Sequence, residues 1–473
     1  MLNRFLSFYS ASYEKAIVYM LQRSEYQIGK FSFWYWKFPN FRQVSYRGEL
    51  KKTVVAKIIL LILIILRILL NLLGLFLVLK NLLFPVGPIL ILLAPLIEYI
   101  LLLPTVSMLR FFYIKPKMFR MNRRAEDIFK KTSAIKIAVL GSYGKTTVKE
   151  LLAQVLASKY KVAFTPGNMN TQIAHARFAL SLKGDEDFII IEYGEEHPSD
   201  IAKMATVTHP DYAIITGMAP AHLDAMKNLD VVADELGSIL NFVDAEKVFW
   251  NAGSEQLKKH LDARLKFANS YSDQLVLGQK ISRIDASSIN GISFKLGSTK
   301  LNSKILGQHM AGSLGLISVL AKKFKLSDAD IAAAIAQTKA FEARMQPISL
   351  GGATMINDGY NGNIEGIEAG IETLTKLKVG GRKIYATPGL IAQGEQNTAV
   401  HKKIGQLLAE SNFDRIYLFK NSNTEIIFNT MLQLNPNSKP EFIEDPLKFL
   451  KNIQSFLANG DVILVQNDLP DGA

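Results

Sequence analysis

The stretch AVLGSYGKTTVKELL, residues 138–152, decides the fold of this chain. An apolar run ends in a glycine-containing loop, and a helix-like pattern follows. Such a loop presents backbone N–H groups and the positive end of a helix dipole to phosphates, while Lys145 would reach the outer phosphates and Thr146 would hold magnesium. A tight strand-to-helix turn with a chance lysine is the alternative interpretation. The predicted nucleotide contacts are Gly141, Ser142, Tyr143, Gly144, Lys145, Thr146 and Thr147.

Strand-like and helix-like runs alternate around this loop. AIKIAVLG is followed by VKELLAQVLASKY, then by DFIIIEYG and DYAIITGM. This alternation predicts an α/β fold with a mostly parallel sheet covered by helices. The loop then lies between a strand and a helix N-terminus, where phosphate binding requires it.

Charge and composition narrow the class of partner. The chain has 473 residues, 55 Lys and Arg against 42 Asp and Glu, and no cysteine, so disulfides and thiolate metal sites are excluded. A net charge of +13 is compatible with nucleic acid, anionic lipid or phosphorylated substrates. Its distribution favours a membrane and no nucleic acid, because basic residues flank a long apolar stretch. They are Arg42, Arg47, Lys51 and Lys52 before it, and Arg110, Lys115, Lys117, Arg120, Arg123 and Arg124 after it.

Residues 54–79 form an apolar run longer than the about 20 residues that a helix needs to cross a bilayer. A second apolar run, residues 82–109, contains four prolines and should be kinked or broken. With a turn at Lys80 and Asn81, the two runs predict a hairpin whose ends both face the cytoplasm. A buried helical pair in a soluble protein is the alternative. Polar residues inside the runs should pair with each other or with a partner, namely Arg67, Asn71 and Glu98.

Further motifs follow the phosphate loop in a recognisable order: TPGNMNTQIA, IEYG, TGMAPAHLD, GQHMAGSLG, EARMQPI, NDGYNGNIEGIEAGIETL and TPGLIAQGE. Together with the short glycine spacing of GSYGKTT, they resemble the Mur ligase family over residues 134–473, and its D-alanyl-D-alanine-adding branch above all. The resemblance implies a phosphate-loop ATPase domain with a mostly parallel sheet, then a smaller Rossmann-like C-terminal domain. It also implies ATP and Mg²⁺ as cofactors.

The resemblance assigns roles to individual residues. Glu192 ends the strand DFIIIE and corresponds to a magnesium ligand, and His222 to a histidine beside the metal, which gives Thr146, Glu192 and His222 as the metal set and Lys145, Glu192 and His222 as the catalytic set. Asn168 and Asn170 belong to a loop that touches substrate and phosphate. The nucleotide contacts beyond the phosphate loop are Arg344, Asp358 and Asn361. Each of these also has a structural interpretation, as a strand-end carboxylate, a loop histidine, turn residues or a surface charge.

Three departures from the family pattern are visible. A hairpin replaces the N-terminal domain that binds the uridine nucleotide, so the substrate is expected to be lipid-linked or presented by another protein. Ser313 stands where the family has an asparagine after Gly-x-His. Leu236 stands where the family has a carbamylated lysine, so the second metal is lost, held by substrate and water, or held by Glu235.

The predicted activity is ATP-dependent amide formation through an acyl phosphate, on a peptide or lipid-linked cell-wall precursor at the cytoplasmic membrane. A membrane-anchored polyglutamate-type synthase and a catalytically reduced ATP-binding scaffold for cell-wall enzymes are the alternatives. Membrane lipids and cell-wall enzymes are the other expected partners. The predicted organisation is an aromatic and basic interfacial segment (1–52), a transmembrane hairpin (53–110), a basic linker (111–133), the ATP-binding domain (134–345) and the C-terminal domain (346–473).

Overall fold

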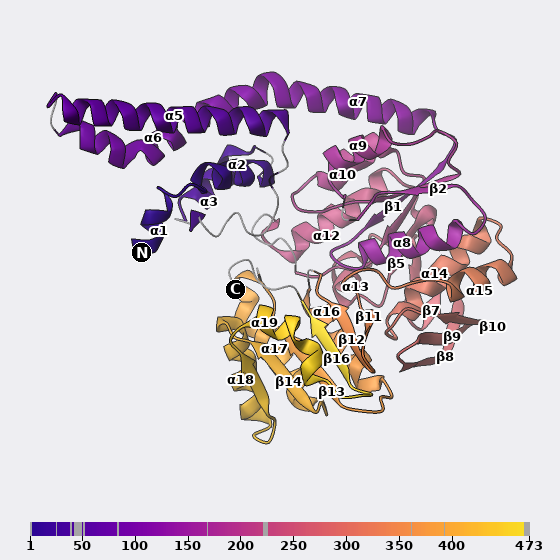
Figure 1. Ribbon diagram of the computed structural model, residues 1–473. Coiled ribbons are helices and arrows are strands. Elements are labelled where there is room, and N and C mark those ends of the chain that lie inside the picture. Colours follow the sequence, from indigo (N-terminus) through magenta and orange to yellow (C-terminus); the bar gives the residue numbers. More distant parts are fainter. Residues whose placement is uncertain are drawn as a thin grey trace. The chain divides into compact units, whose positions relative to one another are not determined.

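The computed structural model describes residues 2–467, apart from residues 25, 38–39, 42–49, 51–52, 83–84, 168, 221–225, 361 and 392. It contains two compact units, Met1–Arg120 and Met121–Ala473, which are treated separately below (Figure 1). Four groups of predictions lie outside the described residues. They concern Asn168, His222, Asn361 and the basic flank Arg42, Arg47, Lys51 and Lys52.

The first unit is helical. It comprises α1 (Leu2–Ser7), α2 (Tyr13–Arg23), α3 (Ile28–Tyr35), α5 (Val54–Leu79) and α6 (Val86–Leu109). Thr53 caps α5 through its hydroxyl, which accepts the backbone N–H of Ala56 at 3.2 Å. Helix α6 is continuous through Pro95 and Pro104, so the second run is not broken. Thr105 and Ser107 donate to carbonyls one turn earlier, as hydroxyls do around prolines in apolar surroundings.

The segment after the hairpin corresponds to the predicted basic linker. One turn of π-helix (Arg110–Ile114) follows α6 directly, and α7 continues over Lys115–Lys131. The sequence KPKMFRMNRRAEDIFKK has a good helix former at most positions, and its proline lies directly after the π-helical turn. The basic linker is thus helical, with most of its charged side chains exposed.

The described aromatic residues of the N-terminal segment divide between a core and the surface, where Phe33 and Trp36 are 68% and 53% exposed. Tyr13, Phe31, Tyr35 and Phe41 are each at most 2% exposed and pack on α5 and α6. The ring of Tyr35 stacks on that of Tyr99 with centroids 4.0 Å apart. The N-terminal helices are therefore part of the same core as the hairpin.

The second unit contains two sheets. The larger has ten strands in the order β10-β9-β8-β7-β6-β5-β4-β1-β3-β2, parallel from β2 to β6 and antiparallel beyond. Its central strands are fully buried apolar runs, as parallel strands covered on both faces must be. The strands are β1 (Ile135–Leu140), β2 (Val162–Phe164), β3 (Phe188–Glu192), β4 (Tyr212–Ile215), β5 (Val248–Asn251), β6 (Asn269–Tyr271), β7 (Leu275–Val276), β8 (Gln279–Ser288), β9 (Gly291–Leu296) and β10 (Thr299–Ser303).

Alternate residues of β1 face different cores. Ile137 and Val139 pack with α8 (Lys145–Leu156), α14 (Met310–Lys323) and α15 (Asp328–Ala336). Ala138 and Leu140 pack with α7 and a second set of helices. That set is α9 (Gln172–Ala179), α10 (Asp200–Thr208), α12 (Leu229–Gly237) and α13 (Glu255–Leu261).

The smaller sheet has the order β11-β12-β16-β13-β14-β15, with only β11 antiparallel to its neighbour. Helices α16 (Ile364–Lys376), α17 (Asn397–Glu410) and α18 (Ser422–Leu434) cover one face, and α19 (Pro446–Lys451) packs on the other. The predicted α/β class with a mostly parallel sheet is therefore confirmed. The strands are β11 (Gln346–Leu350), β12 (Ala353–Asp358), β13 (Lys383–Thr387), β14 (Arg415–Phe419), β15 (Pro440–Ile443) and β16 (Val462–Gln466).

Candidate nucleotide and ligase site

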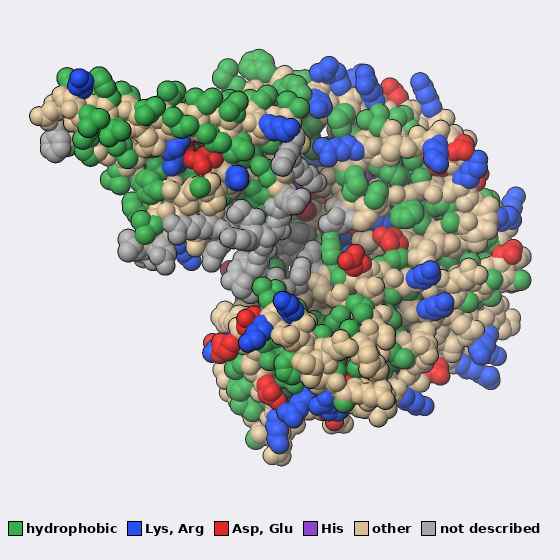
Figure 2. All heavy atoms as spheres, in the orientation of Figure 1, with side chains coloured by type: hydrophobic (Ala, Val, Ile, Leu, Met, Phe, Trp, Pro, Cys, Tyr) green, Lys and Arg blue, Asp and Glu red, His purple; other side chains and the backbone are tan. Residues whose placement is uncertain are grey.

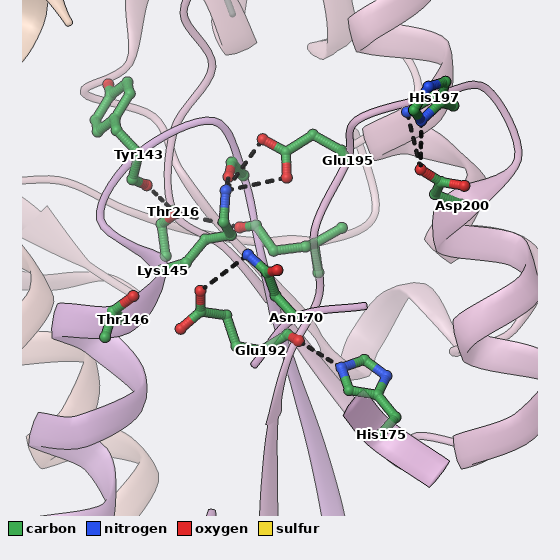
Figure 3. Close-up of polar contacts among 12 residues, drawn as sticks. Tyr143, Lys145, Thr146, Asn170, His175, Glu192, Glu195, His197, Asp200 and Thr216 are labelled. Carbon is green, nitrogen blue, oxygen red and sulfur yellow. Dashed lines mark hydrogen bonds and ion pairs between the residues drawn. The ribbon is translucent and has the colours of Figure 1, made fainter. Parts of the chain in front are cut away.

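The phosphate loop, residues 141–147, runs from the end of β1 into α8, as predicted. Gly141 has φ 132° and Gly144 has φ 77°, and both values favour glycine. The loop is tied to the end of β4: Ser142 donates its backbone N–H to the carbonyl of Gly217 at 2.8 Å, and Thr216 donates its hydroxyl to the carbonyl of Tyr143 (Figure 3). A neighbouring strand therefore fixes the shape of the loop in advance.

Tyr143 contributes to this anchoring through its side chain. A Cβ atom added at Gly217 would lie 2.2 Å from the Tyr143 ring, so residue 217 must be glycine for the ring to fit. Burial raises the pKa of the Tyr143 phenol to about 12. The side chain of Tyr143 packs the loop, which leaves its backbone as the part available to phosphate.

Lys145 is held by a carboxylate that sequence reasoning missed. Its Nζ donates to the two oxygens of Glu195 at 3.1 and 3.0 Å, and also to the carbonyl of Gly141. The side chain of Glu195 is only 2% exposed. Glu195 follows the end of β3 by three residues. Its position after the same strand as Glu192 could have indicated that it lies at the same edge of the sheet.

Lys149, one helical turn after Lys145, is the second missed residue. Its side chain is completely buried, and its Nζ lies 3.2 Å from Oε2 of Glu192. The same Nζ donates to the carbonyls of Thr165 and Gly167 at 2.7 and 2.6 Å. Lys149 therefore joins the predicted metal ligand Glu192 to the loop that contains the predicted substrate residues. The spacing of four residues on α8 was the available signal.

Glu192 is further fixed by its neighbours. Asn170 donates its amide to Oε1 of Glu192 at 3.4 Å, and Thr165 accepts the Glu192 backbone N–H at 3.0 Å. His175 meets the carbonyl of Glu192 at 2.7 Å from a fully buried position, and this burial lowers the pKa of its ring to about 4. Asn170 thus lies beside Glu192, as its assignment to the site requires.

Arg344 reaches the phosphate loop from the segment before β11. Its Nη2 donates to the hydroxyl of Thr146 at 3.1 Å, and its guanidinium lies 4.3 Å from the ring centroid of Tyr360. Ala343 and Met345 on either side have φ of 53° and 46°. Such left-handed conformations in residues with side chains are strained and concentrate at functional sites. The structure therefore brings Arg344 together with Thr146.

Asp358 lies in the same region but faces its own domain. One carboxylate oxygen accepts the backbone N–H of Met345 at 3.0 Å, and the other accepts the amide of Gln466 at 2.9 Å. Burial raises the pKa of Asp358. Through Met345, Asp358 holds the segment that carries Arg344. Its predicted contact with nucleotide stays a prediction.

Glu235 is engaged elsewhere, which favours the other two alternatives for the second metal. Its two oxygens accept the backbone N–H groups of Ser199 and Ile201, both at 2.6 Å, at the start of α10. These are donors that a helix N-terminus leaves without intrahelical partners, which makes Glu235 a helix cap. Leu236 is fully buried in the core that α12 shares with the sheet.

The donors at this edge fit a magnesium ion. The Thr146 hydroxyl and the Glu192 carboxylate are hard oxygen ligands, and buried Oε2 of Glu192 accepts no hydrogen bond, although it forms an ion pair with Lys149. Among the described residues, no group of three or more His, Cys, Asp or Glu side chains is placed to hold a metal by itself. Magnesium bound with one or two protein ligands and the phosphates of a nucleotide needs no such group.

Two family models match the second unit. The Mur ligase middle domain matches residues 139–312, and the Mur ligase glutamate ligase domain matches residues 343–466. The first match includes the phosphate loop with Glu192, and the second begins one residue before Arg344. The chain belongs to the Mur ligase family. Within that family, the curated relatives to which it is similar are MurF ligases.

Individual relatives agree with this assignment. The UDP-N-acetylmuramoyl-tripeptide--D-alanyl-D-alanine ligase of Borreliella burgdorferi is 27% identical over 299 residues, which cover 62% of this chain and 64% of the relative. The ligase of the same name from Haemophilus influenzae is 26% identical over 323 residues, which cover 66% of this chain and 70% of the relative. The MurF ligase of Thermotoga maritima, solved in complex with ADP, superposes with a TM-score of 0.63 at 22% identity, covering 75% of this chain and 81% of that one. The last similarity establishes the fold. The chain thus aligns with about two thirds of the length of these curated relatives.

Proposed function

We propose that this protein is a MurF-type ligase, which uses ATP to join an amine to the carboxylate of a cell-wall peptide precursor at the cytoplasmic face of a membrane. The observation that carries the proposal is the convergence of Lys145, Thr146, Glu192 and Arg344 on one phosphate loop. These side chains come from both Mur ligase domains, so the arrangement depends on the whole second unit.

The proposed reaction has two steps. A substrate carboxylate oxygen attacks the γ-phosphorus, and the bond from that phosphorus to the β–γ bridging oxygen breaks to release ADP. The amine nitrogen then attacks the acyl carbon, loses a proton, and phosphate leaves. Lys145 and Arg344 place positive charge beside the transferring phosphoryl group, which is the main requirement of phosphoryl transfer. The amine of Lys149 donates hydrogen bonds to two carbonyls of the 165–170 loop and so holds it in place. Asn170 of this loop donates to Glu192.

In this proposal, Thr146 and Glu192 would hold a magnesium ion. When bound, it would neutralise charge on the phosphates. His222, which lies outside the described residues, is retained in the proposal as a further residue at the metal.

The first unit supports attachment to a membrane. Its two candidate spans are long and apolar enough to cross a bilayer, and only 17% of the apolar window in α5 is buried, in contrast to the core helix of a soluble protein. Figure 2 shows hydrophobic side chains along the visible face of this hairpin. Basic residues on α7, including Lys117 and Arg120, would lie next to the cytoplasmic surface. Because the hairpin precedes the ligase domains, we propose a lipid-linked acceptor.

Phosphate release tests the activity. Purified protein in detergent is given MgATP with D-alanyl-D-alanine and either UDP-N-acetylmuramoyl-tripeptide or the same peptide on a lipid carrier. The expected result is phosphate release that depends on the acceptor, greater with the lipid-linked peptide, with a product mass increased by the dipeptide minus water. If no phosphate is released with either acceptor or with any other peptide carboxylate, the proposal is contradicted.

Leu236 favours an alternative function, that of a catalytically reduced scaffold that binds ATP. Its buried apolar side chain supplies no metal ligand at that position. A scaffold would bind MgATP and release no phosphate with any acceptor, so the same assay separates the two functions.

A further inference from the structure

The strongest unexplained contact in the ligase unit is the one between Lys145 and Glu195. Both side chains are largely buried, at 14% and 2% exposure, and Nζ lies about equally far from the two carboxylate oxygens, at 3.1 and 3.0 Å. Figure 3 shows Glu195 on the loop after β3, with its carboxylate turned to the amine of Lys145. The lysine expected at the outer phosphates is thus neutralised by a carboxylate of the same chain.

Nucleotide binding must change this pair. The phosphates of ATP carry several negative charges, and Lys145 can neutralise them only by turning from Glu195 or by sharing its charge. Either way Glu195 becomes a buried carboxylate close to the phosphates, with its counter-charge reduced. A buried carboxylate whose counter-charge is reduced is costly, and a like charge beside it adds to that cost.

A divalent cation removes the conflict. Magnesium carries two positive charges and accepts carboxylate oxygen or water that a carboxylate orients. Glu192, three residues before Glu195 and proposed above as a ligand of the same ion, has a second cation beside it in Lys149 at 3.2 Å. The carboxylate that loses a cation to the phosphates is therefore Glu195.

Glu195 also differs from the buried carboxylate Glu235 of the same unit. The oxygens of Glu235 bond to backbone N–H groups of Ser199 and Ile201, which do not move without unwinding α10. Glu195 instead holds the end of a flexible lysine side chain, which can turn to another partner without a change in the backbone.

We propose that Glu195 makes nucleotide binding depend on magnesium: it holds Lys145 while the phosphate loop is empty and faces the magnesium ion when MgATP binds. This inference rests on the proposed function of the loop as an ATP site. Free ATP would bind weakly because Glu195 repels it, whereas MgATP brings the charge that Glu195 requires.

Equilibrium binding of ATP to the full chain in detergent, without acceptor, tests this directly. Dissociation constants are measured by calorimetry in EDTA and in excess Mg²⁺ for the wild type, Glu195→Gln and the matched control Glu196→Gln, whose side chain is adjacent and exposed. The wild type and Glu196→Gln should bind MgATP far more tightly than free ATP. In Glu195→Gln, free ATP should bind about tenfold more tightly than in the wild type, so that the ratio of the two constants falls about tenfold or more.

Two results would overturn the inference. One is an unchanged ratio in Glu195→Gln, and the other is an equal loss of affinity for free ATP and MgATP, which would make Glu195 only a support for Lys145. Thermal unfolding without nucleotide establishes that the variant is folded. If it is not folded, Glu195→Ser, which has a smaller neutral side chain, should show the same fall in the ratio of the two dissociation constants. Failure of the wild type to bind ATP in either condition would instead reject the proposed function.

Discussion

The hairpin and the phosphate loop both bury a basic side chain against a glutamate, in two different settings. In the hairpin, Arg67 donates from Nε and Nη2 to the two oxygens of Glu98, with Nη2 at 2.8 Å from Oε2. At the phosphate loop, Lys145 offers a single amine to Glu195. The arginine contact is a two-point fork, whereas the lysine contact is a point charge on a flexible stem.

The difference indicates what each pair is for. Arg67 is also placed 3.5 Å from Glu14 and 4.9 Å from the ring centroid of Tyr13, so helices α2, α5 and α6 meet around it. Such a pair fixes helices in register. The pair at Lys145 lies on a loop shaped for phosphates, where a stronger anion competes for the amine. A buried ion pair is thus structural or exchangeable according to whether a rival ligand can reach it.

Removal of the exchangeable lysine should give the largest effect. Lys145→Ala is expected to lower acceptor-dependent phosphate release by about a thousandfold, because the charge beside the γ-phosphate is lost. The fold should persist with lower stability, because Lys145 lies outside the hydrophobic cores but its loss leaves the buried Glu195 without this cation. Phosphate release and circular dichroism in detergent check the two parts, with the exposed Lys258→Ala on α13 as the control. Full activity of Lys145→Ala would reject the assignment of the loop.

Disruption of the hairpin pair should instead affect stability. Arg67→Leu leaves Glu98 buried without its fork, which costs about 3 kcal/mol, whereas Arg67→Leu with Glu98→Leu should recover most of that loss. The free energy of unfolding is measured by SDS titration in detergent micelles. Lys57→Leu is the control, because it is an exposed cation on the same helix. If Arg67→Leu behaves like Lys57→Leu, the pair does not fix the helices.

The sequence predicted the loop well and its supporting residues poorly. Gly141, Gly144 and Lys145 were recognisable because phosphate chemistry demands those residue types at that spacing. Glu195 and Lys149 were not, because a buried lysine or glutamate in a linear sequence looks like any exposed charge. Their roles depend on which loop folds over them, and only tertiary packing specifies that.

The hairpin shows the same limit. Apolar length predicted α5 and α6. The cost of polar groups in lipid predicted that Arg67, Asn71 and Glu98 would pair with each other or with a partner, and Arg67 does pair with Glu98. It did not predict that Tyr13 and Tyr35 would be buried against those helices, because aromatic residues suit both a membrane interface and a helical core. Prolines in α6 suggested a kink or a break, but the backbone remains helical through both Pro95 and Pro104.

Lys149 occupies an intermediate position in this comparison, as a buried pair that also supports the site. Lys149→Met keeps much of the volume but removes the donors to Thr165 and Gly167 and the cation at Glu192. The expected loss in kcat/KM for ATP is about a hundredfold, while Lys149→Arg should recover part of it because the charge is kept. Steady-state kinetics with varied MgATP measures both, against Lys159→Met just after α8 as the control. Equal activity of Lys149→Met and Lys159→Met would mean that the 165–170 loop needs no such support.

The smallest effect is expected for an ion pair remote from both regions, Asp461 with Arg382. The carboxylate of Asp461 is 2% exposed and accepts from Nη2 of Arg382 at 2.6 Å and from two backbone N–H groups. Burial opposes ionisation, but these hydrogen bonds prevail and lower the pKa of Asp461 to about 2, from an ordinary value of 3.8. The pair therefore stabilises the native state fully above pH 4, and the contribution is lost as pH falls towards 2. Because Arg382 is 39% exposed, solvent screening reduces the contribution to about 1 to 2 kcal/mol.

Hydrogen exchange of the β13 and β16 amides in the full chain measures this local stability, since both strands flank the pair. Asp461→Asn should lower their protection at pH 7, and the difference from the wild type should shrink below pH 4. Asp185→Asn, which removes an exposed pair with Lys161, should leave protection unchanged at every pH. A difference between wild type and Asp461→Asn that is constant down to pH 2 would show that the variant loses packing rather than charge. Such a result would leave the hairpin and the phosphate loop as the two places where buried charge decides the behaviour of this protein.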